Sequence, residues 1–525
     1  MDVKSGEKIS TRSNYRPEEA MSEGITAREL LRIVTKKKGE EINTFIPPIS
    51  LKERLLLEAY KLLDDLTEFN DVIIPLKTTH IPLKWTLILE FLRKQGIAIN
   101  KNIPFYRKVE NDAPKRFMAQ VQTDNIQNIT DGVTWPGGII GYGLAENAEQ
   151  SSAKAMGEFL ERFFLLTYRR KNLFFSDTKT LKNKKINFLE PKISQFFTAE
   201  QRNHFPKKCA YPEEGKFGWV KGVSLIENIP VWLPAQLVYW NYNRQYDGQE
   251  EPMLMEQNTN GGAGQFSRDK AILSGLRELI ERDAFLIHWL KKVPPRRIAL
   301  DSIKDEKIQK LLQEFSQYQY QVELCDVTLD MGERAVTVVV IDRSHLGPTL
   351  IVAGACHTNI IVAIHKALLE ALFCCHGQRM FTIDKTLPDA YQPFFDDRVG
   401  HKERSALSSN PKNFDQYAWF ITGEIYQLTV EENNQTVISD DVALKDLIQF
   451  FREKNKYIYY YEVAHKTLAY LQYHVVKVIV PSLVPFYLIE THAPLNHPRL
   501  NEDIPEYIKS KMTEKGFNII PHPFP

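Results

Sequence analysis

Residues 258–283 read NTNGGAGQFSRDKAILSGLRELIERD, and residues 141–162 read GYGLAENAEQSSAKAMGEFLER. Each stretch runs from a Gly-x-Gly sequence, which predicts a turn, into a segment with apolar residues at helical spacing, and each ends in Glu-x-x-Glu-Arg. Carboxylates at positions i and i+3 of a helix lie on one face. Two helices that each carry such an acid pair predict a multi-carboxylate cation site, because hard divalent cations prefer oxygen ligands.

A single Glu-x-x-Glu-Arg is explained more simply by an exposed helix face with an intrahelical ion pair. The second copy changes this interpretation, because carboxylates beside so much apolar sequence are costly to bury unless they are paired or bound to a metal. We expect the acids to hold Mg²⁺ that carries a polyphosphate, with the arginines facing phosphate oxygens. The residues concerned are Glu158, Glu161 and Arg162 in the first copy, and Glu278, Glu281 and Arg282 in the second.

The composition is that of an ordinary globular protein: 525 residues, 43% hydrophobic and 25% charged, with a formal net charge of +1. This charge balance argues against a nucleic-acid binder. No apolar run approaches the roughly 18–20 residues of a membrane span, and the N-terminus lacks the apolar segment of a secretory signal, so we expect a cytoplasmic protein. Cys374 and Cys375 lie in an apolar helical run, which favours buried thiols over a redox or zinc site.

The chain is predicted to consist of four parts. These are a flexible leader (1–25), a small N-terminal domain (26–115) with helices over 27–35, 51–66 and 85–95, an α/β body (116–505), and a tail (506–525). In the body, strands are expected over 219–225, 231–239, 335–342, 350–355, 457–463 and 475–481, and helices over 272–290, 303–318, 361–375 and 441–453. The expected fold class is therefore α/β (α+β), with internally repeated helix-on-sheet units around the expected Mg²⁺ and polyphosphate site.

Common nucleotide and catalytic motifs are missing from the sequence. There is no Walker A P-loop, no complete Rossmann fingerprint, no His-Glu-x-x-His and no nucleophile elbow. A polyphosphate bound by this chain would therefore be held by the acid helices and not by a P-loop.

The two acid helices, the segment NTNGGAG, and the stretches 222–239 and 475–500 together resemble the YcaO superfamily over about residues 117–505. The resemblance implies a YcaO-like fold in which helix carboxylates hold Mg²⁺ ions that carry ATP. It implies metal ligands at Glu158, Glu161, Glu278, Glu281 and Glu370, and at Asp269 if the chain bulges by one residue. It implies ATP contacts from Lys154, Arg162, Gln265, Arg282 and Lys366.

Several of these positions depart from the family's pattern. Lys154 stands where a hydroxyl residue is expected, Gln265 replaces the usual Asn, and Lys366 replaces the usual Arg. Lys270 stands in place of an acid, and the family's Gln near Glu370 is absent unless Gln378 substitutes for it. The lysines can still contact phosphate as point charges, or they mark a chain that has lost part of its metal site.

The chain ends in Pro521-His522-Pro523-Phe524-Pro525, which matches the PxPxP tail of azoline-forming members of this superfamily. Proline at alternate positions favours an extended arm. The simpler explanation is a frayed terminus. The resemblance instead implies a tail that reaches the active site, with the carboxylate of Pro525 as a candidate general base.

The resemblance implies an ATP- and Mg²⁺-dependent cyclodehydratase that converts Cys, Ser or Thr of a ribosomally made precursor peptide to a thiazoline or oxazoline. It implies a separate E1-like partner protein that binds the leader peptide, and it admits a flavin dehydrogenase as a further partner and a homodimer as the default oligomer. The alternatives are another reaction of the superfamily, thioamide or amidine formation, and a non-catalytic scaffold that keeps the fold.

Overall fold

The computed structural model describes residues 105–108, 117–122, 139–246, 248–343, 348–378, 385–512 and 516–524. The predicted leader, the three predicted helices of the N-terminal domain and Pro525 lie outside these residues. Contacts divide the chain into two units. The first comprises Met1–Asn111, Lys115–Ile126 and Pro136–Phe159, and the second comprises Asp112–Pro114, Gln127–Trp135 and Leu160–Pro525.

The described part of the first unit is an antiparallel sheet and the start of a helix. The strands are β1 (Phe105–Lys108), β2 (Phe117–Gln122) and β3 (Ile140–Ala145), in that order, and α5 (Ala148–Leu166) begins here. A side chain at Gly141 or Gly143 would collide with the α5 backbone. The turn predicted at these glycines is therefore wrong: they are strand residues, and they let β3 lie directly against the helix.

The second unit contains two large sheets. The six-stranded sheet has the order β4-β5-β15-β16-β9, with β6 paired to β5, and the five-stranded sheet has the order β13-β12-β11-β10-β14. The strands of the first are β4 (Phe174–Asp177), β5 (Lys216–Ser224), β6 (Ile229–Pro234), β9 (Gly262–Gln265), β15 (Tyr459–Glu462) and β16 (His474–Ile479). Those of the second are β10 (Arg296–Ile298), β11 (Tyr320–Asp326), β12 (Arg334–Asp342), β13 (Leu350–His357) and β14 (Ile425–Tyr426).

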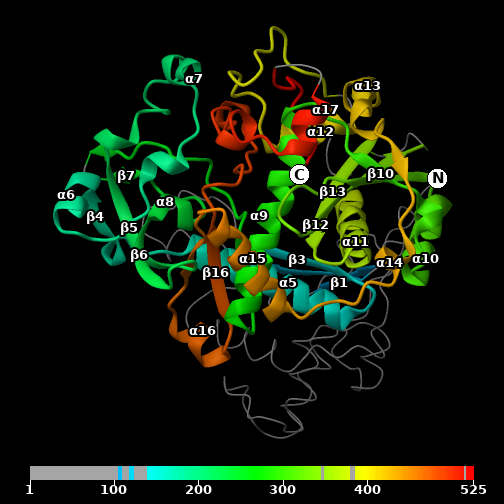
Figure 1. Cartoon of the computed structure of the whole chain (residues 1–525), viewed down its shortest axis with the longest axis horizontal. Helices are drawn as coiled ribbons and strands as arrows, with labels where there is room; N and C mark the ends of the chain where they lie inside the picture. Colours follow the sequence, from blue (N-terminus) through cyan, green and yellow to red (C-terminus); the bar gives the residue numbers. More distant parts are fainter. Residues whose placement is uncertain are drawn as a thin grey trace, which may run out of the picture. The chain divides into compact units, whose positions relative to one another are not determined.

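Helix α9 (Arg268–Leu290) packs against both sheets and joins two hydrophobic cores (Figure 1). Its first half, from Ala271 to Ile280, lies in a core with β16 and α15 (Asp440–Glu453). Its second half, from Ala284 to Leu290, lies in a core with β12, β13 and the C-terminal residues up to Phe524. The second Glu-x-x-Glu-Arg sits where these two cores meet, so the packing of the whole unit fixes its position.

The remaining helices cover the sheets or connect them. Helix α11 (Ile360–Gln378) packs against β12 and β13, and α10 (Glu306–Gln317) against β11. The shorter ones are α6 (Thr178–Asn183), α7 (Ala199–His204), α8 (Ala235–Val238), α12 (His401–Ser409), α13 (Phe414–Tyr417), α14 (Val430–Asn433), α16 (Lys466–Leu471) and α17 (Glu506–Lys511). The strand predicted over 231–239 ends early, at Pro234, because proline cannot donate to a strand ladder, and α8 follows it. The predicted mixed fold of helices on sheets is confirmed.

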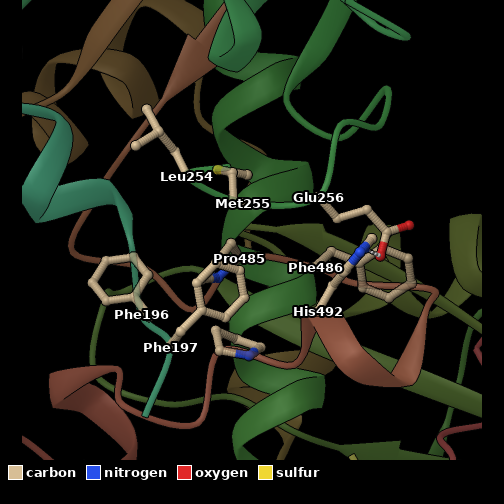
Figure 2. Close-up of a pocket in the computed structure, with 9 residues that line it drawn as sticks. Phe196, Phe197, Leu254, Met255, Glu256, Pro485, Phe486 and His492 are labelled. Carbon is tan, nitrogen blue, oxygen red and sulfur yellow. Dashed lines mark hydrogen bonds and ion pairs between the residues drawn. The ribbon is translucent and has the colours of Figure 1, made fainter. Parts of the chain in front are cut away.

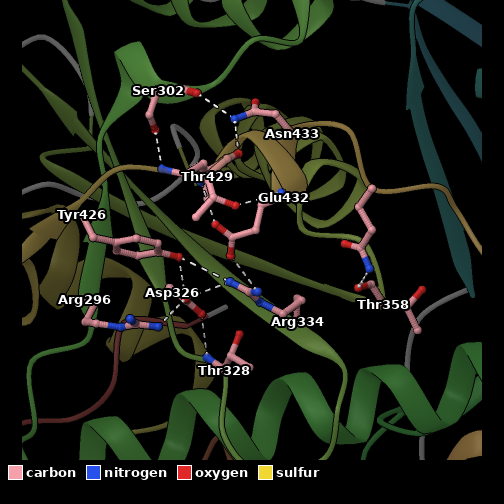
Figure 3. Close-up of polar contacts among 12 residues, drawn as sticks. Arg296, Ser302, Asp326, Thr328, Arg334, Thr358, Tyr426, Thr429, Glu432 and Asn433 are labelled. Atoms are coloured by element: carbon pink, nitrogen blue, oxygen red, sulfur yellow. Dashed lines mark hydrogen bonds and ion pairs between the residues drawn. The ribbon is translucent and has the colours of Figure 1, made fainter.

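A polar network fastens β14 and α14 to the five-stranded sheet (Figure 3). The carboxylate of Asp326 accepts hydrogen bonds from Arg296 (3.2 Å), Arg334 (3.3 Å) and the Tyr426 hydroxyl (2.7 Å). Arg334 also pairs with Glu432 of α14 at 3.0 Å. A buried carboxylate with this many partners stabilises the fold. In this respect Asp326 differs from Glu278 and Glu281 of α9.

All five cysteines, including Cys374 and Cys375, are buried and unbridged, as the sequence predicts for core thiols. Among the residues that the structure describes, none of the helices has the length and apolar character needed to cross a membrane.

Candidate active site

Glu278 and Glu281 lie one turn apart in α9, where the two cores meet. Glu281 is buried, and a side chain at Gly354 of β13 would lie only 2.6 Å from its Oε1. Glycine at this position therefore makes room for the carboxylate. Arg282 forms an ion pair with Glu281 and reaches Glu278 at 4.0 Å.

The site carries more negative than positive charge. Burial, together with the nearby carboxylates of Glu278 and Glu370, raises the pKa of Glu281 to about 7, although Arg282 opposes this shift. Acids that raise each other's pKa in this way need a cation to stay ionised together. This is the electrostatic condition that a bound Mg²⁺ relieves.

The loop 258–262 brings Glu161 of α5 and Glu278 of α9 to the same few peptide groups. The Gly261 N–H donates to Oε2 of Glu278 at 2.9 Å, and Gly261 has a φ of +80°, which favours glycine. A side chain at Gly262 would lie 2.9 Å from Oε1 of Glu161. The two glycines thus let both carboxylates approach the backbone.

Lys477 of β16 is a buried cation at this loop that the sequence analysis missed. Its Nζ donates to the carbonyl oxygens of Asn258 (2.9 Å) and Asn260 (2.5 Å). Burial lowers its pKa to about 8, and the carboxylates of Glu278 and Glu161 oppose this shift. The signal was present in the sequence, because a single lysine interrupts the apolar strand VVKVIV.

The donor set fits Mg²⁺ in one particular way. Among the described residues, no group of three or more His, Cys, Asp or Glu side chains is assembled as a protein-only metal site. Mg²⁺ does not require one, because it keeps several waters and binds through one or two carboxylates plus substrate phosphates. Glu161, Glu278 and Glu281 are the residues whose surroundings fit this kind of binding.

The other predicted site residues lie in different surroundings. In the first unit, Lys154 donates to the Leu144 carbonyl at 2.9 Å, and Glu158 accepts from the Tyr142 N–H. Asp269 is exposed in the first turn of α9, more than two turns before Glu278, and pairs with Arg268 at 3.5 Å. The remaining four are Arg162, which follows Glu161 in α5, Gln265 at the end of β9, and Lys366 and Glu370, both exposed and one turn apart on α11.

The C-terminal tail packs along the second half of α9. The Asn518 N–H donates to the Leu290 carbonyl at 2.8 Å, and the Trp289 indole donates to the Ile520 carbonyl at 2.9 Å. Phe524 is buried, and its ring lies 4.0 Å from the guanidinium of Arg282. The described end of the tail therefore contacts the arginine that pairs with Glu281.

A buried ion pair holds the tail in place. Arg404 of α12 pairs with Glu490, and both side chains are buried. Arg404 also donates to the carbonyl oxygens of Leu488 (2.5 Å) and His522 (3.3 Å). The His522 Nε2 in turn lies 2.7 Å from the Tyr487 carbonyl. Because guanidinium is a rigid fork with several donors, one side chain fixes two chain segments together.

Phe486 connects this tail to a small pocket (Figure 2). Its ring centroid lies 6.0 Å from that of Phe524, and Arg282 lies 5.3 Å from it. On the pocket side, Glu256 accepts from the backbone N–H groups of Leu488 and Ile489 and contacts His492 at 3.1 Å. These contacts fix the segment that carries Phe486.

Comparisons with known proteins found a matching family model and similar sequences. A family model described as YcaO cyclodehydratase, ATP- and Mg²⁺-binding, matches residues 141–484. An uncharacterized protein of Methanothermobacter thermautotrophicus is 27% identical over 270 residues, which are 51% of this chain and 66% of that protein.

Two solved structures share the fold. A heterocyclase in complex with substrate and cofactor has a TM-score of 0.62 at 16% identity, covering 83% of this chain and 57% of its own. YcaO from Methanopyrus kandleri, bound with AMPPCP and Mg²⁺, has a TM-score of 0.52 at 17% identity, covering 76% and 91%. The chain thus spans less than two thirds of the archaeal relative and of the heterocyclase.

Proposed function

Because this chain belongs to the YcaO family of ATP- and Mg²⁺-binding cyclodehydratases, we propose that it forms azoline rings in the backbone of a ribosomally made precursor peptide. The thiol or hydroxyl of a Cys, Ser or Thr attacks the carbonyl carbon of the preceding amide. The new C–S or C–O bond closes the ring, and loss of the phosphorylated amide oxygen as phosphate, together with the amide proton, leaves the C=N bond of the thiazoline or oxazoline. Mg-ATP, when bound, supplies the phosphoryl group that makes this oxygen a leaving group.

The observation that supports this proposal best is the crowding of acids at Glu278 and Glu281, which share the cation Arg282. Burial and neighbouring acids raise the pKa of Glu281 to about 7, although Arg282 is next to it. Asp326, by contrast, accepts from two arginines and a tyrosine. We infer that Glu161, Glu278 and Glu281 hold Mg²⁺, with Glu370 and the first-unit acid Glu158 as further predicted ligands and Asp269 as a weaker one.

Phosphate contacts are assigned to the cations near these acids. Arg282 is held by Glu281 and by the rings of Phe486 and Phe524, so its position is set before a nucleotide binds. A guanidinium held in this way stabilises charge on a phosphoryl group without reorganising. Arg162, Lys366, Lys154 and Gln265 stay predicted ATP contacts.

The tail is proposed to supply the general base. Phe524 lies against Arg282, so the residue that follows it is one peptide unit from the α9 site. Pro525 itself lies outside the described residues. Its carboxylate can accept the proton of the attacking thiol or hydroxyl, or the amide proton that is lost as the ring closes. The proposed precursor peptide is presented by an E1-like partner that binds its leader, and a flavin dehydrogenase would act on the finished azoline.

The test combines this protein, the E1-like partner and the precursor encoded near its gene with Mg-ATP, followed by mass spectrometry. Cyclodehydration predicts the loss of one water per ring together with phosphate release. Exchange of an amide oxygen for sulfur, with a sulfide donor present, identifies thioamide formation instead. If the protein causes no mass change and hydrolyses no ATP with the partner present, it is a non-catalytic scaffold.

Removal of residues 521–525 tests the tail separately. The truncated protein is expected to bind an ATP analogue with Mg²⁺ but to form rings at least about 100-fold more slowly, which is the lower end for loss of a general base. Addition of a single residue after Pro525 is the matched control, because it displaces the carboxylate and leaves the packed residues 516–524 intact. Normal ring formation by either variant would show that the terminal carboxylate has no catalytic role.

A further inference from the structure

Asn260 is a buried polar residue in the middle of the loop 258–262. It is 7% exposed, and neither Nδ2 nor Oδ1 of its side chain has a hydrogen-bond partner among the residues that the structure describes. The backbone on both sides of it is fixed: its carbonyl accepts from Lys477, and the next N–H donates to Glu278. The free amide is therefore held within one residue of the acid site.

The neighbouring asparagine of the same loop shows what a structural role looks like. Asn258 donates from Nδ2 to the Phe486 carbonyl at 3.0 Å, and its Oδ1 accepts from the Asn260 N–H at 3.1 Å. Both ends of that amide are used within the protein. A buried donor or acceptor without a partner costs about 1–3 kcal/mol, and Asn260 leaves one of each. A ligand that binds there would offset this cost.

We propose that Asn260 binds a backbone amide of the substrate peptide. Its Oδ1 accepts the peptide N–H and its Nδ2 donates to the peptide carbonyl. This assignment rests on the proposed function, because it names a contact to that substrate. A phosphate would use only the donor and would be repelled by Oδ1, and Mg²⁺ would use only the oxygen. A peptide group satisfies both atoms at once.

The position suits a peptide that reacts between the acids and the tail. Asn258 links the loop to Phe486, whose ring lies near Arg282 and Phe524. A peptide strand held at Asn260 thus lies next to Gly261, whose N–H binds Glu278. It also lies two residues from Asn258, which binds the Phe486 carbonyl. Asn260 acts as a positioning residue beside the reacting amide.

The first test compares stability with activity in Asn260→Ala. Because the native amide is unsatisfied, the variant is expected to have an unchanged or higher Tm, whereas kcat/KM for the peptide falls about tenfold or more and the KM for ATP stays within about twofold. Ser194→Ala is the matched control, since it removes another buried unpaired polar atom outside the site and should leave ring formation unchanged. A marked drop in Tm, or a rise in the KM for ATP instead, overturns the proposal.

The second test uses synthetic peptides, cyclised by the wild-type protein, in which single amides other than the reacting one are replaced by esters. In the wild type, one ester position is expected to lower kcat/KM several-fold, because Oδ1 loses the N–H it accepts. In Asn260→Ala the same ester should cause no further loss. Equal losses in both proteins overturn the proposal, while a wild type that cyclises no peptide overturns the proposed function and this inference with it.

Discussion

Two carboxylates of α9, Glu281 and Asp283, are both buried and lie two residues apart, yet they meet opposite surroundings. Asp283 accepts from Arg499 at 2.8 and 3.1 Å and from the Val484 N–H at 2.8 Å. Arg499 also pairs with Asp330 at 2.9 Å. Among the described residues, the cation paired with Glu281 is its neighbour Arg282, and other acids crowd it.

This difference indicates that Asp283 stabilises the fold, whereas Glu281 belongs to the candidate active site. Burial raises the pKa of Asp283 as well, but its carboxylate accepts hydrogen bonds from Arg499 and from the Val484 N–H, so the protein supplies its partners. Glu281 has room beside Gly354, and Arg282, the cation paired with it, also reaches Glu278. Natural proteins leave local rules unsatisfied chiefly at functional sites. On this basis Glu281, and not Asp283, belongs to the cation site.

The largest effect is expected from Arg499→Ala. It leaves Asp283 as an unpaired buried charge, and such losses cost about 3–5 kcal/mol of unfolding free energy. Urea denaturation measures this directly, with the exposed Arg452→Ala as the control. In the same assay Glu281→Gln should lose at most about 1 kcal/mol, because loss of the Arg282 ion pair is offset by relief of repulsion from Glu278 and Glu370. If both substitutions destabilise equally, the contrast between the two acids is wrong.

Glu251 sharpens the comparison, since it is buried without other acids around it. It accepts from Tyr242 (2.7 Å), Gly218 (2.9 Å) and Gln236 (3.1 Å), and burial nevertheless raises its pKa to about 7. The folded state therefore holds this proton more tightly than the unfolded state, whose glutamate has a pKa of about 4.3.

It follows that the unfolding free energy falls as pH rises from about 4.3 to about 7, by about 4 kcal/mol from this group. Glu251→Gln should flatten the dependence across that window, and urea denaturation at several pH values measures it. An unchanged slope in the variant would mean that Glu251 does not titrate near 7. Asp177→Asn is a control outside this network, because the Asp177 carboxyl has its pKa lowered by the Thr180 N–H.

A smaller effect is expected from Arg404→Lys, which tests the link between the tail and the acid site. Lysine keeps the charge opposite Glu490 but loses the fork that reaches both Leu488 and His522. Ring formation should fall about tenfold while binding of an ATP analogue is retained. Arg398→Lys is the matched control, because the exposed Arg398 also pairs with a buried acid, Asp396. Equal ring formation by both variants would show that Arg404 is not needed to position the tail.

The sequence predicted the features that depend on local pattern. The helix expected over 272–290 is α9 (Arg268–Leu290), and Cys374 and Cys375 are buried. Features made by distant partners could not be predicted in this way. Lys477 meets the 258–262 loop only because β16 pairs with β9, and Arg404 reaches the tail only because α12 packs near its end.

The glycines mark the same limit. Gly-x-Gly predicts a turn, but both pairs are strand residues. Gly141 and Gly143 lie against α5, whereas Gly262 lies near the Glu161 carboxylate and Gly264 against the Tyr473 ring. Close approach of a distant backbone leaves no trace in local sequence other than glycine itself. The role of Asn260 likewise depends on which of two asparagines in one loop finds a partner, which only the folded contacts decide.

The central claim is that Glu278 and Glu281 of α9 hold the Mg²⁺ of a magnesium-bound nucleotide. Titration calorimetry with a non-hydrolysable ATP analogue tests it most directly, on the wild type and Glu281→Gln, each with Mg²⁺ and with a chelator. We predict binding by the wild type that requires Mg²⁺, and affinity at least about 10–100-fold lower in the variant. Equal affinity in the wild type with and without Mg²⁺, or an unchanged affinity in Glu281→Gln, would contradict the account.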